Sequence, residues 1–218
     1  MNTHSPRAMA GSTRLMAGLY GLKPWYAARL RPVRQALVAW HVPPGALTGS
    51  GVLFAAGAGA AIAGLPPGLL CGAAVTALLA ARLGCANLDG GVAREGGRTT
   101  RFGAVTNELG DRAADLAALA GCIALAPSAL VAAAGLAATL PSWISLAGTA
   151  AGAPRVQGGP VGKTERCLLL VLAAFTGAAV AVLAVIAVGS VLTAAFRLHR
   201  IWSLTRENPA TPATGAAR

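Results

Sequence analysis

The sequence predicts an all-α integral membrane protein with six transmembrane helices and an N-terminal amphipathic helix at the membrane interface. Three observations lead to this fold class. First, 55% of the 218 residues are hydrophobic and only 11% are charged, while Ala and Gly dominate, as in helices that pack through small residues in lipid. Second, apolar segments long enough to cross a bilayer recur with short connections. Third, the basic residues gather in alternate connections.

The chain before the first apolar segment is expected to contain a disordered part and an interfacial helix. Residues 1–13 are expected to be disordered, and residues 14–203 to form one membrane domain. From Thr13 to Trp40 basic and apolar residues are interleaved, which favours a helix along the cytoplasmic interface with its arginines toward anionic lipid. The alternative, a solvated basic arm, would leave the aromatic residues in water. Residues 204–218 are expected to form a disordered tail.

Prolines and glycines divide the rest of the chain into spans. The first four spans cover about Gly45–Leu65, Leu69–Arg94, Phe102–Leu125 and Pro127–Gly148. The last apolar block, Arg166–Trp202, is too long for one crossing. We divide it near Thr176-Gly177 into a short fifth helix and a longer sixth helix.

The net charge of +11 would suggest a nucleic-acid binder in a soluble protein, but here its distribution indicates membrane topology. Basic residues precede the first span, follow the second and fourth, and end the last, whereas the intervening turns carry no charge. The positive-inside rule therefore places both termini and the Arg-rich loops in the cytoplasm, with the spans in the inner or plasma membrane. Membrane lipids are expected partners and nucleic acid is not.

Five of the seven acidic residues lie between Leu88 and Asp115, in and between the second and third spans. Ionised side chains in membrane helices are costly, so their presence indicates function. In the third span Asn107, Asp111 and Asp115 recur every four residues, and Glu108 lies beside this stripe.

Asp89 of the second span can face Asp111, because a short loop joins the two spans and makes them antiparallel. Clustered carboxylates favour a hard cation, with Mg²⁺ as the first choice. Arg82 lies two turns deeper than Asp89 on the same helix and could form a structural ion pair with Asp115 or Asp89.

The spacing D-G-x2-A-R-x8-G-x3-N-x3-D, from Asp89 to Asp111, resembles the signature of the CDP-alcohol phosphatidyltransferase family. Pro44-Gly45-Ala46-Leu47-Thr48 also resembles the family's P-N-x-L-T at the start of the first span. The resemblance implies transfer of a phosphoalcohol group from a CDP-linked donor, commonly CDP-diacylglycerol, to the hydroxyl of an acceptor that the sequence does not identify. The resemblance implies that this transfer releases CMP and is a step of phospholipid biosynthesis. Relatives commonly form homodimers, so a homodimer is one expectation.

The family's motif holds four aspartates that bind two divalent cations, and this chain departs from it at two positions. Asp89 and Asp111 match the second and fourth aspartates, whereas Ala86 and Asn107 replace the first and third. Affinity for a second cation should fall unless another acid substitutes. The resemblance, with Glu108 and Asp115 as substitutes, predicts Mg²⁺ or Mn²⁺ held by Asp89, Asn107, Glu108, Asp111 and Asp115. Asp111 matches the family's candidate base, and Asp115 is expected to support the site from one turn deeper.

The resemblance also suggests residues for the two substrates. The nucleotide is expected to contact Gly90, Ala93, Arg94, Gly103 and Thr48. The acceptor and its phosphate are expected to contact Arg101, Arg155, Lys163 and Arg166. For Arg155, Lys163 and Arg166, the alternative is a role as topology determinants and lipid anchors.

Two other functions stay open at this stage. Ala86 and Asn107 are compatible with a catalytically weak or inactive relative that binds a CDP-lipid or a protein partner. Membrane carboxylates also occur in small ion or proton transporters. A transporter would need polar residues that continue toward the far side of the membrane, and the sequence shows none there.

Overall fold

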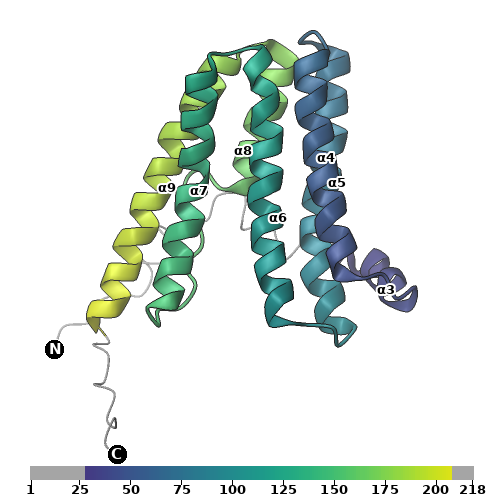
Figure 1. Ribbon diagram of the computed structural model, residues 1–218, viewed down its shortest axis with the longest axis vertical. Helices are drawn as coiled ribbons and strands as arrows, with labels where there is room; N and C mark the ends of the chain where they lie inside the picture. The colour runs from purple at the N-terminus through teal and green to yellow at the C-terminus, as the bar shows by residue number, and fades with distance from the viewer. Residues whose placement is uncertain (1–27, 208–218) are drawn as a thin grey trace, which may run out of the picture.

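The computed structural model describes residues 28–207, and within that range the chain is helical and contains no strand. The helices stand side by side as an upright bundle, with one short helix at its foot (Figure 1). In chain order they are α3 (Arg31–Ala39), α4 (Pro44–Gly64), α5 (Leu69–Glu95), α6 (Arg101–Ala120), the 3₁₀ turn η2 (Gly121–Ala124), α7 (Ser128–Ala150), α8 (Lys163–Thr176) and α9 (Ala179–Glu207). The all-α class is confirmed.

Four of the described helices, α4, α5, α7 and α9, are long and apolar enough to cross a membrane. The chain is therefore a membrane protein. Two expected spans do not meet this criterion by length and composition. Helix α8 has only 14 residues, and α6 carries several charged residues along its 20 residues.

The amphipathic helix α3 lies against the end of α5 at the foot of the bundle (Figure 1). Pro32 occupies its first turn, where a missing backbone N–H removes no intrahelical hydrogen bond. Leu37 and Val38 pack against Leu88 and Val92 of α5. Helix α3 covers the end of the expected interfacial helix, and the expected residues before 28 lie outside the described range.

Gly177 separates α8 from α9, so the expected division of the last apolar block is confirmed. Its φ of 74° is the left-handed conformation that glycine adopts at low cost. Helix α9 continues to Glu207, past the expected end of the domain at residue 203. Arg206 stacks over the Trp202 ring at 4.0 Å and the Thr205 hydroxyl bonds to the carbonyl of Ile201, which extends the last turns. The expected disordered residues 1–13 and 208–218 lie outside the described range.

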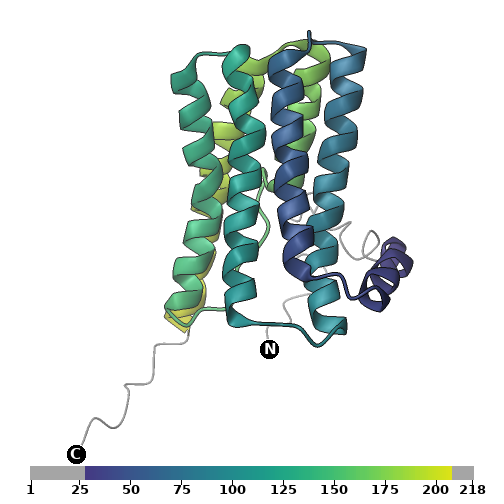
Figure 2. The ribbon, with the colours of Figure 1, turned by 45° about the vertical axis from the view of Figure 1, so that its right-hand side comes forward.

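The turns at the two ends of the bundle differ in charge. The uncharged turns after α4, η2 and α8 lie at one end, and the α5–α6 loop, α3 and the C-terminal end of α9 lie at the other (Figure 1). Helix α4 packs on α5 and α6, α7 packs on α9, and α8 packs on both α5 and α9. Figure 2 shows the same neighbours from a second direction.

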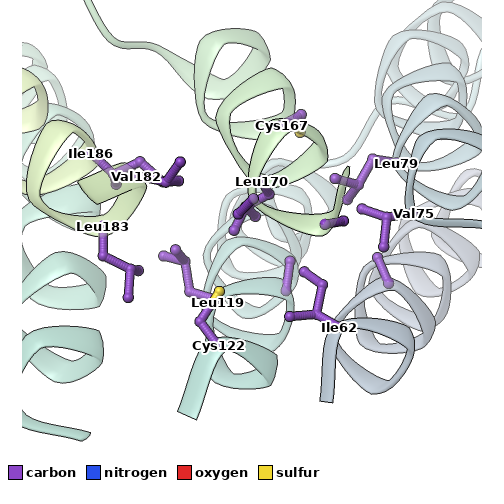
Figure 3. Packing of buried hydrophobic residues seen from close by; sticks show 14 of the residues in the cluster. Ile62, Val75, Leu79, Leu119, Cys122, Cys167, Leu170, Val182, Leu183 and Ile186 are labelled. Atoms are coloured by element: carbon purple, nitrogen blue, oxygen red, sulfur yellow. The ribbon is translucent and has the colours of Figure 1, made fainter. Parts of the chain in front are cut away.

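The apolar core lies toward the uncharged end, where side chains from α4, α5, η2, α8 and α9 meet (Figure 3). Ile62, Leu79 and Leu183 are among its largest buried members. Glycines bring α4 and the end of α6 into backbone contact there: a Cβ at Gly59 would collide with the carbonyl oxygen of Ala117. Small residues thus hold the helices close where lipid provides no hydrophobic driving force.

Candidate active site

A small pocket of ≈ 10 Å³ lies between α4, α5 and α6, toward the charged end of the bundle. Thr48, Asp89, Asn107 and Asp111 line it, together with Ala86. Asp89 and Asp111 come from helices joined by a short loop, so antiparallel packing brings both carboxylates to one pocket. The pocket therefore combines two acidic side chains, one amide, one hydroxyl and the guanidinium of Arg82.

Asp89 is held in place by two hydrogen bonds and is only 5% exposed. Its Oδ1 accepts from the backbone N–H of Gly90 at 2.5 Å, and its Oδ2 accepts from the Thr48 hydroxyl at 3.3 Å. Thr48 reaches this position because Gly110 of α6 has no Cβ, which would collide with the Thr48 methyl group. The start of α4 and the middle of α6 thus both fix the Asp89 carboxylate.

Each of the three acids of α6 forms an ion pair with a base from the α7–α8 loop or the start of α8. Glu108 pairs with Arg155 at 2.5 Å, Asp111 with Lys163 at 2.5 Å, and Asp115 with Arg166 at 2.6 Å. The bases occur in the same order along the chain as the acids. The segment from Arg155 to Arg166 therefore runs alongside α6 and neutralises its acidic stripe.

Hydrogen bonds to α7 and α9 hold this segment inside the bundle. The Ser145 hydroxyl donates to the carbonyl of Val156 at 2.8 Å. The Thr193 hydroxyl accepts from the backbone N–H of Val161 at 3.0 Å. Arg197 Nε donates to the carbonyl of Gly158 at 3.0 Å. The loop's polar backbone is thus satisfied by side chains from both neighbouring helices, as burial requires.

Asp115 lies deeper, in a buried network of arginines. Arg82 and Arg166 both pair with its carboxylate, and Arg112 lies 3.9 Å from it. Arg82, Arg166 and Asp115 are each at most 6% exposed. The expected ion pair between Arg82 and Asp115 is confirmed. These groups join α5, α6 and α8, and they compensate charges that would be costly alone in the membrane.

The other predicted site residues lie around the pocket or at its cytoplasmic side. Gly90, Ala93 and Arg94 occupy the last turns of α5, where the Arg94 guanidinium lies over Gly90. The Gly103 N–H donates to the N-cap hydroxyl of Thr100. Arg101 is exposed at the start of α6. Glu108 and Asp115 do not line the pocket. The roles assigned to all these residues stay predictions.

Two arginines that the sequence did not assign to the site lie near the ion pairs of α6, outside the lining of the pocket. Arg112 donates to the Ser142 hydroxyl at 2.5 Å, and Arg197 donates to the Ser145 hydroxyl at 3.1 Å. Arg197 also lies within electrostatic range of Arg112, Arg155 and Arg166. The one sequence signal for Arg112 was its place directly after Asp111, whereas Arg197 resembled a membrane-boundary anchor.

No protein-family model and no curated protein matches this sequence. Solved structures do match. One is a structure of Mycobacterium tuberculosis phosphatidylinositol phosphate synthase (PgsA1) in complex with manganese and citrate. It matches with a TM-score of 0.61 and 26% identity, and the match covers 79% of this chain and 88% of that chain. A structure of the same enzyme with CDP-DAG bound gives a TM-score of 0.60 and 28% identity, over 79% of this chain and 92% of that chain.

The similarity to these structures supports the resemblance to the CDP-alcohol phosphatidyltransferase family. The similarity of fold agrees with the spacing from Asp89 to Asp111 on which the resemblance rests. The matched structures support CDP-alcohol phosphatidyl transfer in phospholipid biosynthesis, the activity that the resemblance implies.

The pocket between α4, α5 and α6 fits a divalent cation. Asp89 and Asp111 offer carboxylate oxygens, and Asn107 offers a neutral carbonyl oxygen. Hard cations such as Mg²⁺ and Mn²⁺ prefer such oxygen ligands. In the described chain no three side chains of His, Cys, Asp or Glu are arranged as a metal-binding group. The pocket therefore offers fewer metal ligands than a centre lined by carboxylates alone.

Proposed function

We propose that this enzyme uses CDP-diacylglycerol as donor and transfers its phosphatidyl group to an acceptor hydroxyl at the pocket between α4, α5 and α6. The observation that carries the proposal is that Asp89 and Asp111 line one pocket at the charged end of the bundle. The M. tuberculosis enzyme with CDP-DAG bound supports the same donor for this chain.

Asp89, Asn107 and Asp111 would hold Mg²⁺ or Mn²⁺, which when bound neutralises negative charge on the pyrophosphate. Asp111 accepts the proton of the acceptor hydroxyl, because it is the carboxylate of α6 that lines the pocket. Glu108 positions Arg155, and Asp115 positions Arg166. The two acids outside the pocket thus support the site through the bases that they hold.

The nucleotide would lie over the last turns of α5, beside the pocket. Gly90 and Ala93 present small residues there, and the Arg94 guanidinium lies directly above Gly90. Gly103 lies in the first turn of α6, and Thr48 near the start of α4 bonds to Asp89, the residue before Gly90. Arg101, exposed at the end of the Arg-rich loop, would attract the anionic donor from the cytoplasmic side.

The acceptor is proposed to be anionic. Arg112, Arg155 and Arg166 lie within electrostatic range of Arg197. Within residues 28–207, the acids paired with these arginines are Glu108 and Asp115. The excess of guanidinium groups suits a phosphate. The matched M. tuberculosis enzyme is a phosphatidylinositol phosphate synthase, which supports a phosphorylated polyol as the acceptor here.

We also propose that α6 and α8 cross the membrane with the other four helices, so that both termini lie in the cytoplasm. Helix α6 directs its acids inward, whereas Leu109, Leu116 and Phe102 are exposed on its outer face, where lipid would cover them. Helix α8 pairs with α5 and α9 within the bundle. An even number of crossings then agrees with the charged end lying inside. A homodimer stays a prediction.

The test is release of CMP by the purified protein from CDP-diacylglycerol with Mn²⁺, across a panel of neutral and phosphorylated acceptors. We expect release with a phosphorylated polyol and none after chelation of the metal. Ala86 and Asn107 favour one second candidate, an inactive relative that binds the CDP-lipid. That candidate predicts binding of CDP-diacylglycerol without CMP release under every condition, which would contradict the proposed activity.

A further inference from the structure

The charge balance of the pocket suits one divalent cation rather than two. Asp89 and Asp111 are its two carboxylates, Asn107 adds a neutral amide, and the side chain of Ala86 has no ligand atom. Paired metal ions lie about 3.5–4 Å apart and need anionic ligands to offset their mutual repulsion. Two carboxylates balance the charge of one divalent cation and leave nothing for a second.

The nearby acids cannot make up the difference without breaking ion pairs. Glu108 is held by Arg155, and Asp115 is held by Arg82 and Arg166. Arg82 itself lines the pocket and adds a positive charge to its wall. Moving Asp115 toward the pocket would leave two arginines uncompensated in the bundle. Glu108 and Asp115, the expected substitute ligands, therefore already form ion pairs with arginines.

Lys163 already places a positive charge at the pocket. Its ammonium lies 2.5 Å from Asp111 Oδ1, and its side chain is 26% exposed. The backbone fixes this position, because Lys163 is the first residue of α8 and follows a loop tied to α9 through Thr193. A second divalent cation beside Asp111 would have to displace or approach this ammonium.

We propose that the pocket binds one divalent cation, not two, and that the Lys163 ammonium supplies the second positive charge beside Asp111. This inference rests on the proposed function, since it concerns the same pocket. One metal ion and one lysine would together face the negatively charged pyrophosphate. The lysine would then replace the charge of a metal ion that the pocket lacks the carboxylates to hold.

The direct test is a count of bound Mn²⁺. Purified full-length protein is titrated with Mn²⁺ without nucleotide, and free Mn²⁺ is measured by electron paramagnetic resonance. One Mn²⁺ per chain is the expected result. Two Mn²⁺ per chain, or none, would overturn the inference.

Variants of Lys163 test its part in the site. Lys163→Met removes the cation that competes for Asp111, so Mn²⁺ should bind about tenfold more tightly or better. Lys163→Arg keeps the charge and serves as the matched control, with affinity close to that of the unaltered protein. Lys163→Gln gives a second neutral variant in case the methionine variant fails to fold. Equal Mn²⁺ affinity for the neutral variants and the control would refute the role of Lys163.

Restoring the missing carboxylates should restore the second site. Ala86→Asp with Asn107→Asp and Lys163→Met is expected to bind two Mn²⁺ per chain, and a count of one would contradict the charge argument. CMP release is measured separately. An active enzyme that binds two Mn²⁺ would refute this inference and leave the proposed function intact. An inactive protein that binds one Mn²⁺ would refute the proposed function and leave this inference intact.

Discussion

At the residue scale, the buried carboxylate of Asp115 is the charge on which the packing of α5, α6 and α8 depends. Asp115→Asn would leave Arg82 and Arg166 without their counter-ion, and we expect a loss of about 3–5 kcal/mol in the free energy of unfolding. Denaturant unfolding in detergent measures it. Glu95→Gln, which removes the half-exposed partner of Arg34, is the control and should cost about 1 kcal/mol or less. Equal losses would contradict the assigned role of Asp115.

Sequence patterns predict only part of this residue-scale picture. Helical spacing and a short loop were enough to bring Asp89 and Asp111 to one pocket and to pair Arg82 with Asp115. The pairing of Arg155, Lys163 and Arg166 with the acids of α6 was not predictable. It depends on the path of an irregular loop, which hydrogen bonds to α7 and α9 determine.

At the scale of elements, the contact between α4 and the end of α6 depends on the absence of a side chain at Gly59. Gly59→Ala would push its Cβ against the carbonyl oxygen of Ala117, and the two helices would have to separate. We expect a loss of about 1–3 kcal/mol in the free energy of unfolding. Gly49→Ala, in the same helix with open space around it, is the matched control and should be neutral or stabilising.

The α7–α8 loop is the second element with a testable anchor. Thr193→Val removes the hydroxyl that accepts from Val161 N–H, so amide hydrogen exchange in residues 153–162 should become faster by about tenfold or more. Thr205→Val removes a hydroxyl that bonds only within α9, and it should leave the loop unchanged. Unchanged exchange in both variants would mean that Thr193 does not hold the loop.

The sequence predicts that these helices exist, because long apolar segments separated by turn residues indicate membrane helices. The break at Gly177 was readable for the same reason. The end of α9 at Glu207 was not, because it depends on local contacts such as the stacking of Arg206 on Trp202.

At the scale of the whole molecule, the charge difference between the two ends predicts orientation. In intact cells that carry single engineered cysteines, a membrane-impermeant maleimide should label Ser128→Cys at the uncharged end. Thr99→Cys, in the Arg-rich loop, should react only after the membrane is permeabilised. Both positions are exposed, and Cys71, Cys122 and Cys167 are buried. Cys85 is half-buried, so both variants also carry Cys85→Ser to keep background labelling low. The reverse pattern would place both termini outside.

The central claim is that α5 and α6 jointly present the carboxylates that serve phosphatidyl transfer. The rate of CMP release from CDP-diacylglycerol with Mn²⁺ tests it most directly in Asp89→Asn and Asp111→Asn, with Glu95→Gln as the control. Each pocket variant should lose at least about 100-fold in rate, while the control keeps the rate of the unaltered enzyme. Unaltered turnover in both pocket variants would contradict the assignment of this pocket as the active site.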